Sequence, residues 1–304
     1  MEGKPLNIMK LAPFVAEKVW GGDYLKTLKG VDSVSAIGET LEVSTLRHQN
    51  ATVNGIPLAE QVGDLRFLVK FIETTDNLSV QVHPGDIYAQ EHENSLGKTE
   101  CWLILSAEEG AGIYLGFKPG VSKSHLKQSI AEGKPVDKLL NFYPVEKGDF
   151  FFVPSGAIHA IGKGVLLAEV QQSCGVTYRV WDWNRLGLDG KPRELHLSRA
   201  LDVIEFDEQK NVQNYFQYQK ASLTKKSLTL ANHPDFRFNV FNEAQKIKLG
   251  DRGPNGILNF SHSDLNLIYD NVSLRLGHLD SAIVLPGHGE LDVAGKNPSF
   301  GQVF

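Results

Sequence analysis

The sequence predicts a mainly β chain, built from two β-barrel units with a few short helices. Short apolar or alternating runs recur along its 304 residues and have the length of strands. These runs are rich in β-branched and aromatic residues, and glycine, proline, aspartate or asparagine bounds most of them. Helical patterns are scarcer, and such a chain is typical of a β-barrel or β-sandwich.

The expected elements follow from these patterns. Up to residue 206, the strand-length runs lie at 38–45, 65–74, 78–83, 101–106, 111–117, 148–156, 164–172 and 177–183. Short helices are expected at 122–133, 134–142 and 194–206. The first of these starts with the serine cap Ser122 and ends at Gly133, which are ordinary helix start and stop signals.

A change in composition divides the chain. The polar stretch DEQKNVQNYFQYQKAS begins at residue 207, and strand-length runs then resume as far as residue 295. We therefore expect a larger domain over 1–206, with short helical segments, and a smaller C-terminal β-unit over 207–304.

The charge balance indicates which partners to expect. The 31 basic and 36 acidic residues give a formal net charge of −5, and neither sign forms a long block. Nucleic acids and anionic membranes attract concentrated basic surfaces, so neither is an expected partner. A small molecule is the expected partner instead.

Cysteine use and hydropathy indicate a location. Cys101 and Cys174 lie far apart with no CxxC motif, and the first residues lack the apolar core of a secretory signal. No apolar run approaches the roughly 18 to 20 residues that cross a bilayer. We expect a cytoplasmic chain in which both cysteines are small core residues.

The stretch QVHPGDIYAQEHENSLGKTE, residues 81–100, interrupts two strands in an unusual way. Gln81 and His83 are two apart in an extended segment, so their side chains leave the same face of the strand. Lys98 and Glu100 have the same spacing where the next strand begins. An imidazole, an amide, a cation and a carboxylate are therefore expected to share one interior face.

A second segment with a candidate functional residue is GDFFFVPSGAIHAIGKG, residues 148–164. A hydrophobic strand is followed by a tight turn at Pro154 and Gly156, and then by His159 on the returning strand. This order aims an imidazole back into the mouth of a barrel.

The order of glycine, proline and histidine in that segment, G-x5-P-x-G-x2-H, resembles the second signature of the cupin β-barrel family. Lys163 replaces the asparagine that often follows four residues after the histidine. The segments LSVQVHPGD, GKTE and VPSGAIHAI together resemble the type I phosphomannose isomerases, in their short bacterial form. Further matching segments are VWGG (19–22), GETLEVS (38–44) and AEVQQSCGVTYRVWDWNR (168–185), so the resemblance spans about residues 10 to 205.

The resemblance implies a metal site. By match to the family's segments, one zinc ion per chain is held by Gln81, His83, Glu100 and His159. Imidazole, carboxylate and amide oxygen suit a zinc ion that keeps open positions for water or substrate. The C-terminal unit lacks these motifs, which implies a degenerate, metal-free cupin there.

The resemblance also implies an activity: a zinc-dependent aldose–ketose isomerase of carbohydrate metabolism. It would interconvert mannose 6-phosphate and fructose 6-phosphate through a cis-enediol, while zinc polarises the sugar oxygens. Arg179, Lys98 and Glu169 are the expected catalytic residues. Ser79, Lys98 and Arg179 are the expected contacts to a hexose phosphate, in a monomer or homodimer.

Other functions stay open at this point. Cys174 and Gly175 stand where the family usually has a polar pair that includes an aspartate. A non-catalytic cupin that binds a sugar or sugar phosphate is therefore the main alternative. A cupin of another kind, such as an iron dioxygenase, is a weaker one.

Individual residues also have simpler readings. His83 alone could be a core histidine, Gln81 could orient a water, and Glu169 could merely pair with Arg179. Lys98 and Arg179 could likewise be structural partners of carboxylates. We expect His92 to face solvent on a helix and His288 to belong to a turn, with neither binding metal.

Overall fold

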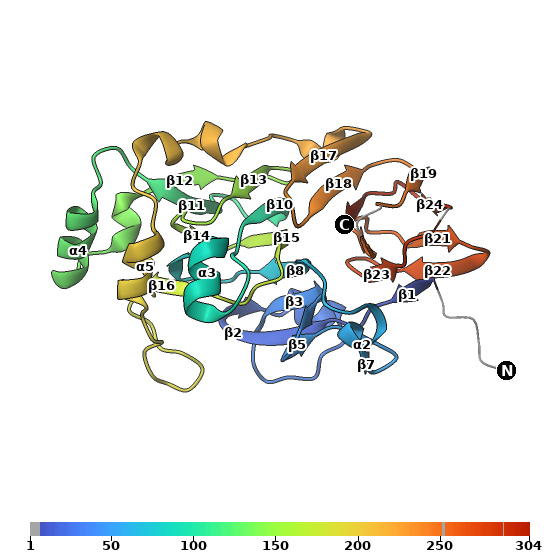
Figure 1. Ribbon diagram of the computed structural model, residues 1–304, viewed down its shortest axis with the longest axis horizontal. Helices are drawn as coiled ribbons and strands as arrows, with labels where there is room; N and C mark the ends of the chain where they lie inside the picture. The colour runs from blue at the N-terminus through green and yellow to red at the C-terminus, as the bar shows by residue number, and fades with distance from the viewer. Residues whose placement is uncertain (1–6, 251–252, 288) are drawn as a thin grey trace. The chain divides into compact units, whose positions relative to one another are not determined.

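The computed structural model describes residues 7–250, 253–287 and 289–304 (Figure 1). The chain divides into two compact units. Unit 1 combines 1–15, 40–71 and 221–304, and unit 2 combines 16–39 and 72–220. The predicted domains, 1–206 and 207–304, are not tested by this division and stay a prediction.

Unit 2 contains the two segments with candidate functional residues, 81–100 and 148–164. Its helices are α1 (Tyr24–Leu28), α3 (Asp86–Glu93), α4 (Lys123–Ala131), α5 (Leu197–Val203) and the 3-10 helices η1 (Val136–Leu139), η2 (Glu208–Lys210) and η3 (Gln213–Phe216). Its strands are β9 (Val80–Val82), β10 (Glu100–Ala107), β11 (Gly112–Phe117), β12 (Leu140–Pro144), β13 (Phe150–Val153), β14 (His159–Ile161), β15 (Val165–Gln172) and β16 (Tyr178–Trp181). Strands β2 (Phe14–Gly22), β3 (Ile37–Val43) and β8 (Phe67–Glu73) have residues in both units.

Two sheets set the positions of the candidate functional side chains. One has the order β12-β11-β14-β9-β16, and the other has the order β13-β10-β15-β8-β3-β2. In the first sheet, Gln81 is the register partner of both His159 and Arg179. In the second, Glu100 is the register partner of both Val153 and Gln171. Register partners leave the same face of a sheet, so each sheet presents one row of neighbouring side chains.

Apolar side chains fill the interior of unit 2. One buried cluster contains Trp102, Phe151 and Leu167, from the strands around β10. A second contains Val82, Ile158 and Tyr178, and the helices α4 and α5 contribute to it. Each fully buried large side chain contributes about 1.5 to 3 kcal/mol to stability, so these clusters fix the strands that carry the polar rows.

Residues with ordinary capping geometry bound the helices α4 and α3. Ser122 caps α4, because its hydroxyl accepts a hydrogen bond from the backbone N–H of His125 at 3.2 Å. Helix α3 ends at Asn94, whose φ of 49° is the left-handed conformation that closes many helices. Figure 1 shows α3 and α5 side by side, and the Tyr88 hydroxyl of α3 donates to the Asp202 carboxylate of α5.

Unit 1 is built mainly from strands. They are β1 (Ile8–Lys10), β4 (Thr45–Leu46), β5 (Gln49–Asn50), β6 (Thr52–Val53), β7 (Ile56–Pro57), β17 (Ser227–Asn232), β18 (Arg237–Phe241), β19 (Gln245–Lys248), β20 (Asn255–Asn259), β21 (Leu265–Tyr269), β22 (Val272–Leu276), β23 (Ser281–Val284), β24 (Glu290–Gly295) and β25 (Phe300–Val303). Helix α2 (Leu58–Val62) and the 3-10 helix η4 (Ser222–Thr224) accompany them. The larger sheets have the orders β1-β23-β20-β25-β18-β17 and β19-β24-β21-β22.

The prediction of a mainly β chain with a few short helices is confirmed. The helix expected at 134–142 is wrong in its second half: η1 ends at Leu139 and strand β12 follows. Pro135 permits a turn of helix after it, but the burial of residues 141–144 then alternates, and Phe142, Tyr143 and Pro144 pair with β11. In the described parts of the chain, every helix is too short to cross a bilayer.

One buried asparagine organises the end of β20 in unit 1. Asn259 is fully buried, and its side-chain amide donates to the backbone carbonyls of Ser263, Leu276 and Gly277. Its Oδ1 accepts from the backbone N–H and the hydroxyl of Ser261. A single side chain thus satisfies the polar groups of two loops.

Replacing this asparagine by alanine removes every one of those contacts. We expect Asn259→Ala to lower the free energy of unfolding by about 2 to 4 kcal/mol, because buried polar groups lose their partners. Urea unfolding followed by circular dichroism measures the change. Asn266→Ala, at an exposed position of β21, is the control and should cost less than about 1 kcal/mol. Equal losses in the two variants would contradict the role assigned to Asn259.

Candidate metal centre

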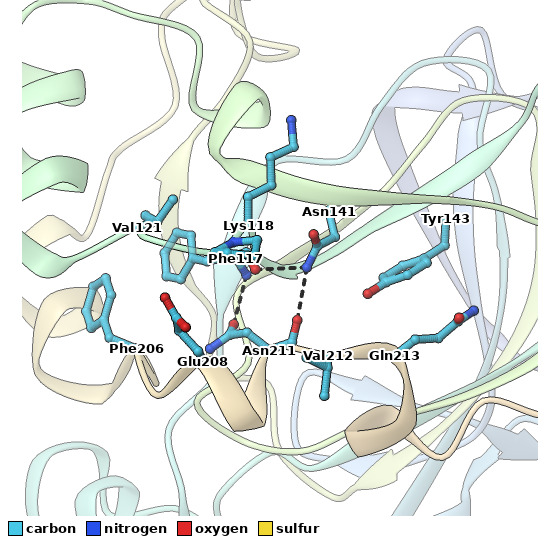
Figure 2. A pocket seen from close by; sticks show the side chains of 11 residues that line it. Phe117, Lys118, Val121, Asn141, Tyr143, Phe206, Glu208, Asn211, Val212 and Gln213 are labelled. Carbon is cyan, nitrogen blue, oxygen red and sulfur yellow. Dashed lines mark hydrogen bonds between the residues drawn. The ribbon is translucent and has the colours of Figure 1, made fainter.

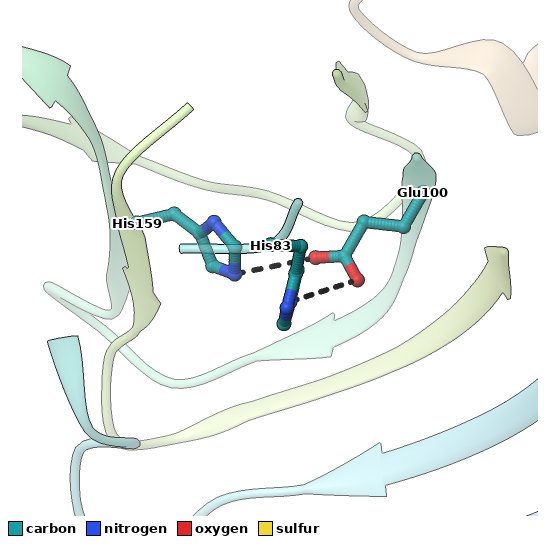
Figure 3. A group of neighbouring side chains, drawn as sticks. All are labelled: His83, Glu100 and His159. Atoms are coloured by element: carbon teal, nitrogen blue, oxygen red, sulfur yellow. Dashed lines mark ion pairs between the residues drawn. The ribbon is translucent and has the colours of Figure 1, made fainter. Parts of the chain in front are cut away.

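Three buried side chains converge in unit 2 (Figure 3). His83 directly follows β9, Glu100 begins β10 and His159 begins β14. Their candidate ligand atoms all lie within 4.8 Å of one another. The Glu100 oxygens lie 3.5 Å from His83 Nε2 and 3.3 Å from His159 Nε2. The interrupted strand and the glycine–proline turn therefore bring their polar residues together as the sequence predicts.

Backbone carbonyls fix the direction of both imidazoles. His83 Nδ1 lies 3.0 Å from the Val176 carbonyl, and His159 Nδ1 lies 2.9 Å from the Ala157 carbonyl. A carbonyl oxygen only accepts, so each Nδ1 carries a proton, and each Nε2 lies on the side of Glu100. Burial lowers the pKa of His159 to about 4, which keeps that imidazole neutral.

This donor set fits a metal ion. Two imidazole nitrogens and a carboxylate are ordinary ligands of zinc and related divalent ions. Hydrogen bonds from the outer imidazole nitrogens to carbonyls are the usual support of metal-binding histidines. A divalent cation between the groups would receive electron pairs from all three side chains.

Gln81 adjoins the three groups. Its Nε2 lies 3.3 Å from His159 Nε2, and its Oε1 accepts from the Ser79 hydroxyl at 3.3 Å. A serine hydroxyl can donate or accept, so the amide can turn its oxygen inward and keep that contact. The structure thus brings Gln81 and Ser79 to the site, and direct ligation by Gln81 stays a prediction.

Lys98 lies inside the same group. Its buried Nζ is 3.1 Å from both His83 Nε2 and the nearer oxygen of Glu100. The expected sharing of one interior face by Lys98 and Glu100 is therefore observed. A positive charge here stabilises the carboxylate and any anionic oxygen that binds beside it.

Glu169 lies on the face of the sheet that carries Glu100. It is the register partner of Trp102 on β10, and the indole Nε1 donates to its Oε2 at 3.1 Å. The Trp102 ring packs edge-on against the His159 ring, with centroids 5.3 Å apart. Glu169 is buried, and its carboxylate is close enough to His159 to raise the pKa of that imidazole, against the larger effect of burial.

Arg179 lies beside Gln81 in the sheet, but its side chain bonds to a backbone carbonyl of a loop. It is the register partner of Gln81, but its Nη1 donates to the Glu194 carbonyl at 2.8 Å. The side chain is half-buried, and burial, followed by the charge of Arg193, lowers its pKa. The guanidinium is thus held by the loop after β16, and its catalytic role stays a prediction.

A hydrogen-bonded clamp closes the inserted segment between His83 and Glu100. Asp86 Oδ1 accepts from the backbone N–H of Gly97 at 2.8 Å and from Gln172 Nε2 at 2.9 Å. Gln172 Oε1 accepts from the backbone N–H of Thr99 at 2.8 Å. A Cβ on Gly97 would lie 2.5 Å from the Asp86 nitrogen, so the close approach requires glycine.

The sequence pattern did not identify this clamp. Asp86 is the first residue of α3, and its partner Gln172 lies 86 residues away at the end of β15. A weaker signal was present in β15, where Glu169 and Gln171 alternate with apolar residues. Polar residues at every second position of an otherwise apolar strand indicate a polar interior face.

Helix α3 is also anchored from outside. The Tyr178 hydroxyl donates to Glu93 at 2.7 Å, and Arg199 pairs with the same carboxylate. Burial, together with the hydrogen bond to Glu93, raises the pKa of Tyr178 to about 12. His92 is exposed on α3, as predicted, whereas His288 lies outside the described residues.

Both cysteines are buried thiols, in agreement with their expected place in the core. Burial raises the pKa of Cys101 well above its usual value, which keeps this thiol protonated. Cys174 Sγ accepts hydrogen bonds from Ser95 Oγ and from the backbone N–H of Val176. Neither thiol has the features of a nucleophile.

A separate cavity of about 250 Å³ lies between β11, β12 and the segment after α5 (Figure 2). Its polar groups are mostly engaged in joining these elements. Asn141 donates to the carbonyls of Phe117 and Asn211, and Asn211 accepts from the backbone N–H of Phe117. Glu208 accepts from the backbone N–H of Gly120. We therefore take the buried His–Glu–His group as the candidate site.

Comparison with known proteins finds relatives with similar sequences. No protein-family model matches the chain. The chain is 43% identical to the mannose-6-phosphate isomerase of Streptococcus mutans over 206 residues, which are 62% of this chain and 65% of that protein. It is 38% identical to the probable mannose-6-phosphate isomerase GmuF of Bacillus subtilis over 213 residues, 64% of this chain and 67% of that protein. The chain thus matches slightly less than two thirds of the S. mutans relative.

The structural likeness extends further along the chain. The crystal structure of the mannose 6-phosphate isomerase from Bacillus subtilis matches with a TM-score of 0.86 and 28% identity, and covers 98% of this chain and 99% of that one. A putative mannosephosphate isomerase from Archaeoglobus fulgidus has a TM-score of 0.77 at 21% identity, covering 98% of this chain and 97% of that one, which supports the fold alone.

The clamp predicts that Asp86 acts on metal binding through the inserted segment. Asp86→Ala removes the acceptor shared by Gly97 and Gln172, so the chain before Glu100 should loosen. We expect the dissociation constant for zinc to rise about 10- to 100-fold, as for other outer contacts of metal ligands. Competition against a chromophoric chelator measures it.

Asp86→Asn is the matched control, because it keeps an oxygen acceptor at the same place. Its zinc affinity should stay within about threefold of the wild type. Equal zinc affinities for the alanine and asparagine variants would show that the clamp does not position the metal ligands.

Proposed function

The chain belongs to the mannose-6-phosphate isomerase family, and on that premise we propose that it interconverts mannose 6-phosphate and fructose 6-phosphate. The observation that carries the proposal is the convergence of His83, Glu100 and His159 with the inner nitrogens of both imidazoles directed at the carboxylate. Such a centre suits an aldose–ketose isomerisation, because a cation held there would stabilise the negative charge that develops on two neighbouring sugar oxygens.

We propose zinc as the ion, held by His83, Glu100 and His159 with Gln81 as a further ligand. The set contains nitrogen and oxygen donors without thiolates, as in catalytic rather than structural zinc sites. Zinc would supply Lewis acidity toward the oxygens of the open-chain sugar.

The remaining charged groups have proposed roles beside the ion. Lys98, 3.1 Å from the Glu100 carboxylate, would stabilise negative charge on the cis-enediolate. Glu169 would carry the proton between C1 and C2 of the sugar. The indole N–H of Trp102 hydrogen-bonds its carboxylate and holds it on the interior face, which is what a positioned base requires.

The phosphate needs a cationic group farther from the ion. Arg179 offers a planar guanidinium beside Gln81 in the sheet register, and Ser79 offers a hydroxyl next to the same glutamine. We propose that both contact the phosphorylated end of the sugar. The Arg179 guanidinium would keep its bond to the Glu194 carbonyl and use its other N–H groups for phosphate.

A second candidate function is a cupin that binds a sugar phosphate without turnover. The pair Cys174 and Gly175 is the observation that favours it, because by resemblance the family has a polar pair with an aspartate at these two positions, and Gly175 is exposed without a side chain. Calorimetric binding of mannose 6-phosphate with no conversion, in the wild type and in Gly175→Asp alike, would support this alternative. The predicted cytoplasmic location and the monomeric or homodimeric state stay predictions.

His159→Ala tests the isomerase proposal. Removing one imidazole from the ligand set should leave less than about 0.1 equivalent of zinc per chain and lower kcat/KM at least 10²-fold. A coupled assay of fructose 6-phosphate formation, alongside metal analysis, measures both. His92→Ala replaces an exposed histidine and should keep wild-type values. Zinc-loaded wild type that converts no mannose 6-phosphate would refute the proposed activity.

A further inference from the structure

Gln171 is a buried polar side chain beside the metal centre that the functions assigned above do not use. It lies on β15 as the register partner of Glu100, so both side chains leave the same face of the sheet. Directly opposed residues have Cβ atoms about 4.5 to 5.5 Å apart. Gln171 is fully buried, so contact with bulk water does not account for a polar amide at this position.

Two backbone carbonyls fix the orientation of this amide. Gln171 Nε2 lies 2.8 Å from the carbonyl of Gln172 and 2.8 Å from the carbonyl of Cys174. Carbonyl oxygens only accept, so the NH₂ group must face them and both of its hydrogens are used. The alternative orientation would set an amide oxygen against two carbonyl oxygens. Gln171 therefore presents only its Oε1 in the remaining direction.

Gln171 Oε1 is a buried acceptor that needs a hydrogen-bond donor. Among the residues that the structure describes, none donates a hydrogen bond to Gln171 Oε1, although the atom is buried. A buried acceptor without a partner costs about 1 to 3 kcal/mol, and such atoms in folded proteins are rare. A donor from a bound molecule would remove that cost.

We propose that Gln171 Oε1 accepts a hydrogen bond from the 3- or 4-hydroxyl group of the bound sugar phosphate. The proposal rests on the function proposed above, because a sugar oxygen that reaches the ion beside Glu100 comes within range of the neighbouring strand position. Since both N–H groups of the amide are occupied, the side chain recognises donors alone. It selects a hydroxyl over hydrogen, fluorine or an ether oxygen at the same sugar carbon.

The test uses binding rather than turnover. A hexitol 6-phosphate is an open-chain polyol phosphate without a carbonyl, so it binds without isomerising. Calorimetry on the zinc-loaded protein compares it with its 3-deoxy and 4-deoxy analogues. In the wild type, one analogue should bind about 10- to 100-fold more weakly than the parent, because the amide oxygen loses its donor.

Gln171→Met keeps the volume of the side chain and removes the acceptor. The ratio of parent to deoxy affinity should then fall to about threefold or less, with zinc content unchanged. Gln171→Asn withdraws the oxygen by one methylene and should give the same loss, which covers the case in which the methionine variant fails to fold. Gln128→Met, on the exposed face of α4, is the control and should keep the wild-type ratio.

A wild-type ratio retained in Gln171→Met or Gln171→Asn would overturn the proposal, and so would a wild type that does not distinguish the deoxy analogues. The latter result would mean that a bound water is the donor. Failure of the isomerase activity is a separate outcome. Discrimination in binding that depends on Gln171, without conversion of mannose 6-phosphate, would support this inference and refute the isomerase.

Discussion

Two backbone carbonyls determine which atoms face the interior of the metal centre. Val176 and Ala157 each accept from an imidazole Nδ1, so His83 and His159 both direct Nε2 at Glu100. Without these contacts, either ring could reverse its tautomer and present an N–H to a metal ion. The chemistry assigned to the site therefore depends on carbonyl positions, which the strands and turns of unit 2 fix.

Residues in and beside the turn after β15 make several of the contacts that orient the candidate site. The carbonyl of Val176 orients His83, the carbonyl of Cys174 orients Gln171, and the side chain of Gln172 closes the inserted segment. Residues 172–176 thus contact one candidate metal ligand, one neighbouring acceptor and the segment that leads into Glu100. A displacement of this short turn would alter all three at once, although the turn itself supplies no ligand.

Local patterns predicted the parts of the site that depend on local geometry. Spacing by two residues placed His83 and Glu100 on interior faces, and the glycine–proline turn aimed His159. The Asp86–Gln172 bond could not be predicted, because it joins positions 86 residues apart whose proximity is set by packing. The partner of Arg179 was missed for the same reason. Where η1 gives way to β12, pairing with β11 overrode a helical pattern.

The departure from the family at Cys174 and Gly175 has unequal consequences. Cys174 Sγ accepts from Ser95 Oγ at 3.4 Å and from the Val176 N–H at 3.3 Å, so the thiol makes the contacts that a hydroxyl would make there. The same turn carries the Val176 carbonyl that orients His83. Gly175 is exposed and removes a side chain from the surface only. Cys174 is therefore bonded into the turn that orients His83, whereas Gly175 has no side chain to take part in it.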